Sequence, residues 1–294
     1  MRIVATLYNP IEMESLANLG ADAFLVNVQG LSTKTRAVFS LSEVSSIINL
    51  AHQAGKLVYV NINVMIEEST LAVLREFLGF LKTEPVDGIV CFDLTVLTVA
   101  LEFGLGEKII YRPGTLNTNV YDPWFFRKMK VKGITLSKDI TLEELVSIGE
   151  NYQGMDISLV GHGYLFLFYS KRRLLKNYFD HKKIFVPNFL EGDTFRLAEK
   201  ARQEGLYPIY EDRFGTHIFR AKKLQSLDEI DVLRPYLSDF FVERMFLPDQ
   251  EYFDSIAVCA GKLEKSAFLI RYGKEYDHGF YYLKTVSKKG APRS

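Results

Sequence analysis

The first 160 residues alternate short apolar runs with longer segments in which apolar positions recur every three or four residues. The short runs have the length and the β-branched content of buried strands, and the longer segments have the period of amphipathic helices. This order of strand and helix, repeated at a spacing of about 25 residues, is typical of a parallel sheet. The strands are predicted at residues 2–7, 23–28, 57–64, 87–92, 108–111, 133–136 and 157–160.

The predicted helices have recognisable ends. The segment after the second strand starts with Ser40 or Ser42 as its cap and Glu43 in its first turn, and it stops at Gly55. Gly20 ends the preceding helix, and Pro123 stands in the first turn of a later one, where its missing N–H costs no hydrogen bond. These signals support the alternating order of strand and helix.

An eighth strand is predicted at residues 239–244, where DFFVER follows a helical segment. It would complete a ring opened by residues 2–7, so the repeats match a closing barrel. An insertion of about 75 residues separates this strand from the seventh one. Within it, residues 207–212 and 216–221 flank a Phe214-Gly215 turn and predict a small hairpin over the barrel mouth.

We therefore predict an α/β fold, a TIM-barrel-like (β/α)8 with an inserted cap segment between strands seven and eight and a short C-terminal tail. The barrel would span residues 1–263, with the cap at about 163–237 and a helix at 250–263. The C-terminal extension would span residues 264–294. The alternative is a doubly wound dinucleotide-binding sheet, which needs a glycine-rich turn after its first strand. That turn reads LYNPIE, and no GxxxxGK[ST] occurs elsewhere, so this alternative is set aside.

The composition is that of an ordinary globular chain. The 294 residues are 48% hydrophobic and 24% charged, which argues against disorder, collagen and coiled coils. The 36 basic and 36 acidic side chains cancel, so any polyanion would have to meet a local patch. The N-terminus has no secretory h-region, and the longest apolar stretch is about half a membrane span. We expect a cytoplasmic protein that does not enter a membrane.

Two cysteines, Cys91 and Cys259, lie far apart in the sequence. They exclude a disulfide framework, and two thiols in one chain cannot build a cysteine-based zinc or iron–sulfur site. Cys91 lies in an apolar run and Cys259 on a helical face, so neither is a convincing nucleophile. No HExxH or GxSxG motif occurs, which removes support for a conventional metalloprotease or serine hydrolase.

Six segments in the same order resemble the collagenase-like peptidase family, family U32. The likeness covers about residues 1–260, and the tail DHGFYYLKTV is similar to the closing segment of the family. The resemblance implies a TIM-barrel-like core and two activities: the peptidase of the family label, and hydroxylation of RNA bases, especially the wobble uridine of tRNA, supported by an iron–sulfur cluster. The six segments are GADAFLV (20–26), the loop reaching Arg36, GIVCFDLTVL (88–97), TLSKDITLEEL (135–145), GHG followed by YLFLFYSKRRLL (164–175), and PIYEDRFGTHI (208–218).

The chain departs from the family pattern at three places. The family cysteines that follow His-Gly are missing after His162 and Gly163, so we expect no cofactor on this chain and leave a divalent metal as a possibility without support. The usual Ser-Arg-Glu is Ser137-Lys138-Asp139 in this chain. Both charges are kept, but a lysine ammonium replaces the arginine guanidinium, which could form two parallel hydrogen bonds. The usual Lys-Ile-Glu-Gly is residues 241–244, which retain the glutamate as Glu243.

Polar residues stand where the predicted strands end, at the functional mouth of a barrel of this type. We expect a catalytic group there, which comprises His162, Asp139, Glu243 and Lys138. The expected substrate-binding residues are Asn27, Arg36, Asn63 (or Asn61 on the same strand), Asp93, Arg112, Arg172, Glu211, His217 and Arg244.

Two of these histidines have alternative interpretations. His162 lies between two glycines, which would let it approach a ligand closely, but a hydrogen-bonded structural histidine is an equal alternative. His217, with Glu211 and Asp212 on the partner run, could hold a metal, although a polar network that stabilises the hairpin is favoured.

Two basic runs are interleaved with aromatic residues. One is Lys171-Arg172-Arg173 beside Phe166, Phe168 and Tyr169, and the other follows Trp124 and Phe125. Such runs can bind phosphate and stack bases, but a solvated helix face is the commoner explanation. The aromatic stripe LFLFY is expected to be core beneath the insertion.

Three functions remain open. The first is RNA modification at the tRNA wobble uridine, alone or as the partner of a longer paralogue of family U32 that carries the cluster. The second is peptide hydrolysis, and the third is a non-catalytic binding or scaffold barrel.

Overall fold

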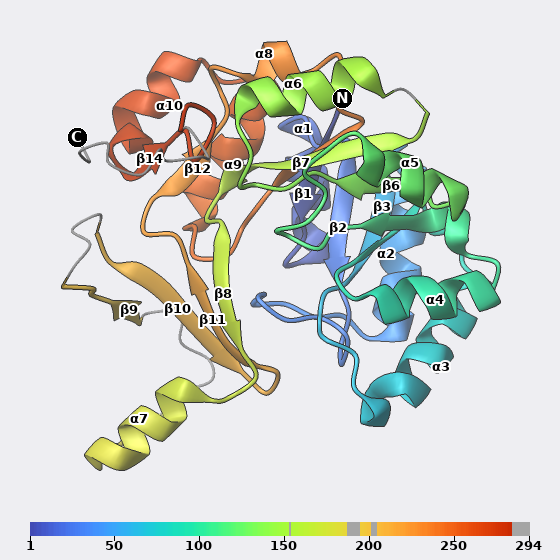
Figure 1. Cartoon of the computed structure of the whole chain (residues 1–294), viewed down its shortest axis with the longest axis horizontal. Helices are drawn as coiled ribbons and strands as arrows, with labels where there is room; N and C mark the ends of the chain where they lie inside the picture. Colours follow the sequence, from blue (N-terminus) through green and yellow to red (C-terminus); the bar gives the residue numbers. More distant parts are fainter. Residues whose placement is uncertain (153, 187–194, 201–204, 284–294) are drawn as a thin grey trace.

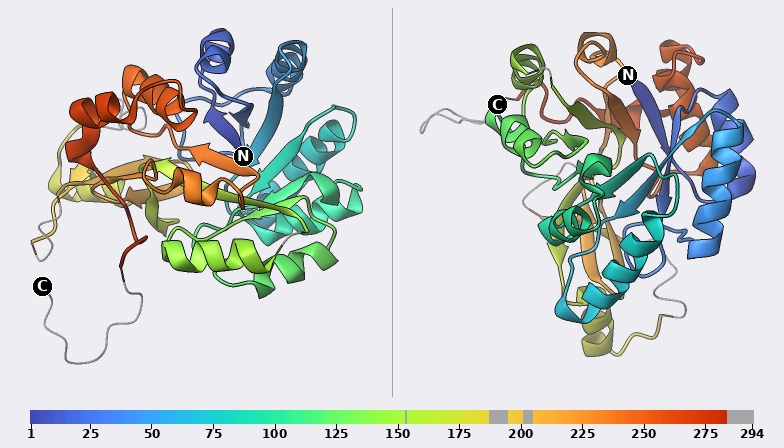
Figure 2. Two further views of the ribbon diagram at one scale, coloured as in Figure 1. Left: turned by 90° about the horizontal axis from the view of Figure 1, so that it is seen from above. Right: turned by 90° about the vertical axis from the view of Figure 1, so that its right-hand side faces the viewer.

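A closed barrel of parallel strands forms the centre of the computed structural model, which describes residues 1–152, 154–186, 195–200 and 205–283. β13 pairs with β1 on one side and with β7 on the other, which closes the ring (Figures 1 and 2). The predicted (β/α)8 fold is therefore confirmed. The barrel strands are β1 (Arg2–Thr6), β2 (Ala23–Asn27), β3 (Leu57–Ile62), β4 (Gly88–Cys91), β5 (Ile109–Tyr111), β6 (Gly133–Thr135), β7 (Asp156–Gly163) and β13 (Asp239–Val242).

Helices follow the strands and form the outer layer. Ser40 is the cap of α2, and its side chain and that of Glu43 form both bonds of a capping box. The last barrel helix, α9, ends at Cys259 rather than at residue 263, because Gly261 takes a left-handed φ of 73°. The helices are α1 (Met13–Asn18), α2 (Leu41–Gln53), α3 (Leu71–Leu81), α4 (Leu94–Glu102), α5 (Tyr121–Lys128), α6 (Leu142–Asn151), α8 (Ile230–Leu233), α9 (Asp249–Cys259) and α10 (Lys265–Tyr272). Short 3₁₀ turns lie at Pro10–Glu12, Glu68–Thr70, Gly106–Lys108 and Gly273–Glu275.

The insertion between β7 and β13 builds a four-stranded sheet in the order β8-β11-β10-β9, with α7 (Leu174–Lys182) at its far end (Figure 1). The predicted hairpin is confirmed as the antiparallel pair β10 and β11. The stripe LFLFY was expected to be core, but it forms the edge strand β8, where Phe168 is 59% exposed. The cap strands are β8 (Phe166–Ser170), β9 (Arg196–Leu197), β10 (Tyr207–Asp212) and β11 (Gly215–Phe219).

A further strand joins the insertion to the barrel. β12 (Lys223–Gln225) pairs with the end of β7, and β14 (Tyr276–Asp277) of the C-terminal segment pairs with β12. Residues 284–294, the end of the predicted extension, lie outside the described residues. Within the described ranges, no helix has the length and apolarity needed to cross a membrane.

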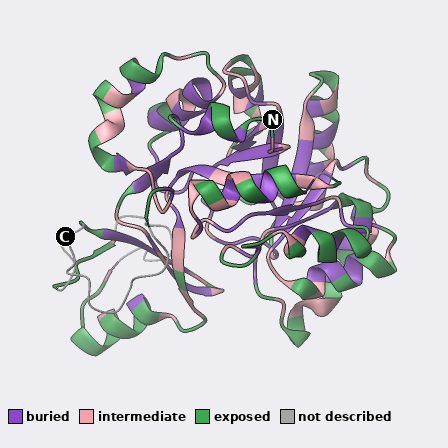
Figure 3. Ribbon diagram, turned by 45° about the horizontal axis from the view of Figure 1, so that its top comes forward, coloured by how far each residue is buried: buried purple, intermediate pink, exposed green. Residues whose placement is uncertain are grey.

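The barrel interior and the outer layer are separate apolar clusters. Alternate residues of each strand face inward, so a small cluster fills the barrel below its mouth. Asp239 closes the opposite end, where it accepts hydrogen bonds from Tyr59 Oη (3.0 Å) and Arg2 Nε (2.6 Å). Figure 3 shows that the strands are almost wholly buried. The interior cluster comprises Val4, Ala23, Leu25, Tyr59, Val90, Ile110 and Phe241.

Candidate functional site

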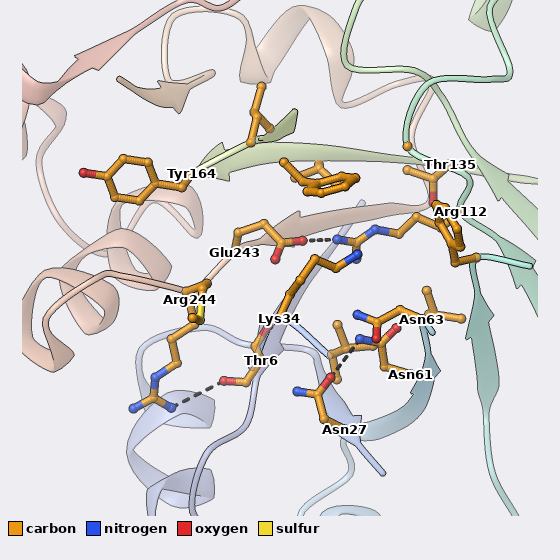
Figure 4. A pocket seen from close by; sticks show the side chains of 18 of the residues that line it. Thr6, Asn27, Lys34, Asn61, Asn63, Arg112, Thr135, Tyr164, Glu243 and Arg244 are labelled. Carbon is orange, nitrogen blue, oxygen red and sulfur yellow. Dashed lines mark hydrogen bonds and ion pairs between the residues drawn. The ribbon is translucent and has the colours of Figure 1, made fainter. Parts of the chain in front are cut away.

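A pocket lies at the carboxyl ends of the barrel strands, beneath the cap (Figure 4). The space between its lining atoms amounts to about 930 Å³, open solvent at the mouth included. The strands supply its polar floor, and the cap supplies an apolar roof that comprises Leu165, Phe166 and Phe219. We call this space the mouth pocket.

An ion pair spans the mouth pocket. Arg112 directly follows β5 and Glu243 directly follows β13, and Arg112 Nη2 bonds to Glu243 Oε1 (Figure 4). The guanidinium also lies 4.8 Å from the centre of the Phe241 ring. Its other terminal nitrogen, Nη1, is buried and has no hydrogen-bond partner. That nitrogen is a donor available to an oxygen atom of a ligand.

Lys34 is a second cation in the mouth pocket, and the sequence prediction missed it. It lies in the loop between β2 and α2 with a left-handed φ of 58°. Its Nζ is 4.5 Å from the centre of the Phe166 ring and 5.4 Å from that of Phe92. Burial, together with the charge of Arg112, lowers the pKa of Lys34 to about 8, although the carboxylates of Glu243 and Asp212 act in the opposite direction. The sequence signal that could have identified Lys34 as a site residue was its position shortly after the end of the second predicted strand.

Three asparagines form the polar floor. Asn61 Nδ2 donates to Asn27 Oδ1 (2.8 Å), and Asn27 Nδ2 donates to Thr35 Oγ1 (3.0 Å). Asn63 is fixed by the backbone of Thr33, from which it accepts one hydrogen bond (2.7 Å) and to which it donates another (3.1 Å). Because β2 and β3 are neighbours, these amides present fixed donors and acceptors to one ligand.

Two further cations line the mouth pocket but already have acidic partners. Lys138 Nζ bonds to Asp139 Oδ2 at 2.9 Å. The Arg244 guanidinium, 1% exposed, bonds to Glu12 at 2.6 Å and Asp249 at 2.9 Å. These ion pairs leave Lys34 and the Arg112–Glu243 pair as the charges that face the space, with a net positive sum suited to an anionic group.

His162 does not face the mouth pocket. It is fully buried, its Nε2 lies 3.0 Å from Ser255 Oγ of α9, and its ring packs against Phe268 and Tyr276. Burial lowers the pKa of His162 to about 3, with a smaller effect from Lys223. The structure therefore favours the interpretation of His162 as a hydrogen-bonded structural histidine.

The glycines around His162 serve strand packing rather than ligand approach. A Cβ on Gly161 would lie 2.0 Å from the Phe240 ring. Gly163 has a φ of 102°, and a Cβ there would lie 2.5 Å from the carbonyl oxygen of Glu243. Both glycines thus let β13 approach β7 closely.

Other predicted site residues stabilise the fold near the mouth. Asp93 caps α4 by accepting from the backbone N–H of Thr95 (2.8 Å). Glu211 caps α7, since it accepts from the backbone N–H of Leu175 (2.8 Å). His217 is buried, and its Nε2 lies 3.0 Å from Thr33 Oγ1. Burial lowers the pKa of His217 to about 2, and Lys34 adds to the effect.

The structure thus brings six of the predicted residues to one space and puts seven elsewhere. Arg36 and Arg172 are exposed and do not line the mouth pocket, and Asp139 reaches it only through Lys138. Besides Lys34, the prediction missed Tyr8 and Tyr164, which line the pocket just beyond β1 and β7. The six are Asn27, Asn63, Arg112, Lys138, Glu243 and Arg244, and the seven are Arg36, Asp93, Asp139, His162, Arg172, Glu211 and His217.

One trio in the described part of the chain has metal-ligand atoms within 4.8 Å of one another: Asp228, Glu229 and His278. It lies beside the C-terminal segment and not in the mouth pocket. Lys265 Nζ is 2.6 Å from Asp228 Oδ1. The amide nitrogen of Gln225 lies 3.3 Å from His278 Nε2, at the long end of the range for a hydrogen bond. Asp228 and His278 thus already have nitrogen neighbours, and Glu229 Oε1 accepts from Tyr282 Oη (2.7 Å), whereas Glu229 Oε2 is buried without a hydrogen-bond partner.

The two cysteines do not fit an iron–sulfur cluster. Cys91 lies on β4 at the pocket floor and Cys259 on α9, and both are buried. Burial raises the pKa of both thiols, whereas cluster ligands are thiolates and usually number four.

Comparisons with known proteins agree on one family. The sequence model of peptidase family U32 matches residues 9–237. The tRNA hydroxylation protein P2 of Bacillus subtilis (strain 168) is 28% identical over 232 residues, which are 79% of this chain and 75% of that protein. The tRNA hydroxylation protein P of Escherichia coli (strain K12) is 27% identical over 258 residues, 73% of this chain and 56% of that protein.

Two other relatives carry the peptidase label. An uncharacterized protease of Methanocaldococcus jannaschii is 24% identical over 316 aligned positions, which cover 96% of this chain and 74% of that protein. The solved structure of the U32 peptidase Mk0906 has a TM-score of 0.52 to this chain at 16% identity, and the match covers 84% of this chain and 94% of the other. At this identity the likeness shows a shared fold.

Proposed function

Because the chain belongs to peptidase family U32, we propose that it acts in tRNA modification, at the wobble uridine, with the mouth pocket as its reaction site. The observation that carries this proposal is the pairing of a cationic mouth pocket with relatives that are named tRNA hydroxylation proteins. A pocket with one free lysine and an arginine N–H without a partner suits a phosphate or another anionic group of a reactant.

A second observation favours RNA over a peptide. Residues 171–183 contain six basic side chains and one acidic one, a net charge of +5 in a chain whose net charge is zero. These residues comprise the turn after β8 and the whole of α7, and Figure 3 shows that α7 is largely exposed. The side chain of Arg172 has no ion pair in the described residues, so it is free for a phosphate.

Peptide hydrolysis has little chemical support in this chain. The Ser255 and His162 pair resembles a nucleophile with its base, but both residues are fully buried outside the mouth pocket. Cys91 lines the pocket, yet its raised pKa keeps it a thiol. Neither arrangement supplies an activated nucleophile to a substrate.

The missing thiolates bear on how the chain works. A reaction that needs an iron–sulfur cluster would have to obtain it from another protein, and we propose a longer, cysteine-containing paralogue as that partner. The chain would then contribute the mouth pocket and the basic surface of residues 171–183, which we call the α7 surface.

Nucleoside analysis of tRNA tests the proposal. In a deletion strain, mass spectrometry should show loss of hydroxylated wobble uridine and of nucleosides derived from it. The wild-type chain should restore them, the Arg112→Met variant should not, and Lys128→Met on the exposed face of α5 should restore them fully. An unchanged nucleoside profile in the deletion strain would remove the proposal.

A further inference from the structure

We propose that Lys34 is a nucleophilic amine that forms an imine with a small carbonyl compound bearing a negative charge, held in the mouth pocket. The inference rests on the mouth pocket being the reaction site, as proposed above, but not on which RNA is modified.

The surroundings of Lys34 differ from those of the other lysines that line or approach this space. Lys138 is 2.9 Å from a carboxylate oxygen of Asp139, and the buried Lys223 is 2.6 Å from Glu251. Lys34 has no carboxylate within ion-pair distance in the described residues, and two aromatic rings face its Nζ instead. A lysine that served only as a structural cation would be expected to have an acidic partner.

The backbone at Lys34 is held in place. Thr33 Oγ1 donates to Asp212 Oδ2 (2.6 Å), and Tyr210 Oη donates to the carbonyl oxygen of Thr35 (3.3 Å). Lys34 adopts a left-handed backbone conformation, which is unfavourable for a residue with a side chain. Strain of this kind persists where the surrounding contacts require it, and here the result is an amine aimed into the pocket (Figure 4).

The chemical state of the amine suits nucleophilic attack. With the pKa of Lys34 lowered to about 8, roughly a tenth of the amine is unprotonated at pH 7, far more than for an ordinary lysine. The unprotonated nitrogen attacks the carbonyl carbon, both of its hydrogens leave with the carbonyl oxygen as water, and a C=N bond replaces C=O. No oxidant or reductant is needed for this step.

The neighbouring groups define the ligand class. Arg112 Nη1, which has no partner, can donate to an anionic oxygen of the same molecule. Phe166 of the apolar roof lies 4.5 Å from Lys34 Nζ, and an apolar neighbour of this kind reduces the hydration of the nitrogen and disfavours hydrolysis of the imine. The ligand would therefore carry a carbonyl group close to a carboxylate or a phosphate.

Reductive trapping tests the inference with glyoxylate as the probe. The full chain is incubated with glyoxylate and sodium cyanoborohydride, digested, and searched for carboxymethyl-lysine by mass spectrometry. Lys34 should be labelled at least tenfold faster than Lys138, which lines the same pocket and serves as the internal comparison. Pre-incubation with excess acetate, which has the charge but no reactive carbonyl, should slow labelling at Lys34 only.

Variants separate this inference from the proposed function. Lys34→Arg keeps the positive charge but cannot form the imine, so it should fail to restore the tRNA nucleosides while its unfolding midpoint stays close to that of the wild type. Labelling of Lys34 no faster than that of Lys138 overturns the imine, whatever the nucleoside analysis shows. Fast labelling of Lys34 in a chain whose deletion leaves tRNA unchanged would retain the imine and remove only the RNA substrate.

Discussion

Arg112 and Glu243 form an ion pair across the mouth of the barrel, although 131 positions separate them in the chain. Each residue directly follows a barrel strand, so ring closure by β13 is what brings them together. The pair lies beside Lys34 and acts on it in two directions: the guanidinium lowers the pKa of Lys34, and the carboxylate raises it.

Opposite substitutions in this pair should move the reactivity of Lys34 in opposite directions. Glu243→Gln removes the charge that stabilises the ammonium, so the pH midpoint of glyoxylate labelling should fall below that of the wild type, which we expect at about 8. Arg112→Met removes the repelling charge and should raise the midpoint. We expect a shift of about 1 pH unit in each of the two variants. Labelling rates measured from pH 6 to 10 give the midpoints, and shifts of the same sign in both variants would contradict the assignment.

The α7 surface should dominate tRNA affinity. A triple variant with Arg172→Ala, Lys182→Ala and Lys183→Ala should bind unmodified tRNA at least ~10-fold more weakly at 0.1 M salt and show a shallower dependence on salt, because three phosphate contacts are lost. The matched control, Lys128→Ala with Lys130→Ala in the second basic run, should bind like the wild type. Fluorescence anisotropy measures both, and equal losses in both variants would point to nonspecific attraction.

Glu12 should matter more for stability than Asp249, although both contact the guanidinium of Arg244. Glu12 is 20% exposed and Asp249 is 73% exposed. Glu12→Gln should lower the free energy of unfolding by about 2–3 kcal/mol, because it weakens the pairing of a buried cation, whereas Asp249→Asn should cost about 1 kcal/mol or less. Urea unfolding at neutral pH checks this order.

Gly161 should not tolerate a methyl group. An alanine Cβ would lie 2.0 Å from the Phe240 ring, so Gly161→Ala should destabilise the fold by about 1–3 kcal/mol through overpacking. Gly79→Ala is the control, since a Cβ in α3 would meet Phe103 at an ordinary 3.6 Å and alanine favours a helix. Thermal unfolding should therefore shift downward for the first variant and not for the second.

Mild acid should destabilise the protein through its buried histidines. The pKa is lowered to about 3 for His162 and about 2 for His217, so below the ordinary value of 6.5 the unfolded chain binds protons that the folded chain does not. The stability is complete above pH 6.5 and should fall by about 1.4 kcal/mol per pH unit for each histidine as the pH decreases toward 5. His162→Phe should reduce this slope by about half, and an unchanged slope would show that His162 is not the source.

The order of strands and helices could be read from the sequence because each element is specified locally. Ser40 with Glu43 and the glycines after the helices mark helix ends through bonds within a few residues. The closure by β13 was also predictable, since a ring of strands leaves one position for the last of them. The edge position of β8 was not, because an exposed aromatic strand has the same residue pattern as a buried one.

Part of the site could also be predicted, because residues at strand ends can be located from the local sequence. Residues at the end of a strand or directly after it, such as Asn27, Arg112 and Glu243, were found because the chain direction fixes which end of the barrel they reach. His162 follows the same rule but packs against the helix layer, because the pairing of β7 with β13 shifts register between Val160 and His162 and so interrupts the alternation of faces. Lys34 lies in a loop, and its neighbours Thr33 and Thr35 are held partly by asparagines of β2 and of the loop after β3 and partly by the distant cap.

The position of the Lys34 amine depends on both the loop between β2 and α2 and the cap, because the two threonines that flank Lys34 contact cap residues. Their contacts reach Asp212, His217 and Tyr210 across 175 or more positions of sequence. A barrel engineered without its insertion, or a chimera that carries a foreign cap, would keep its strands and lose the placement of this amine. In protein engineering, the cap and the loop between β2 and α2 should therefore be exchanged together as one module.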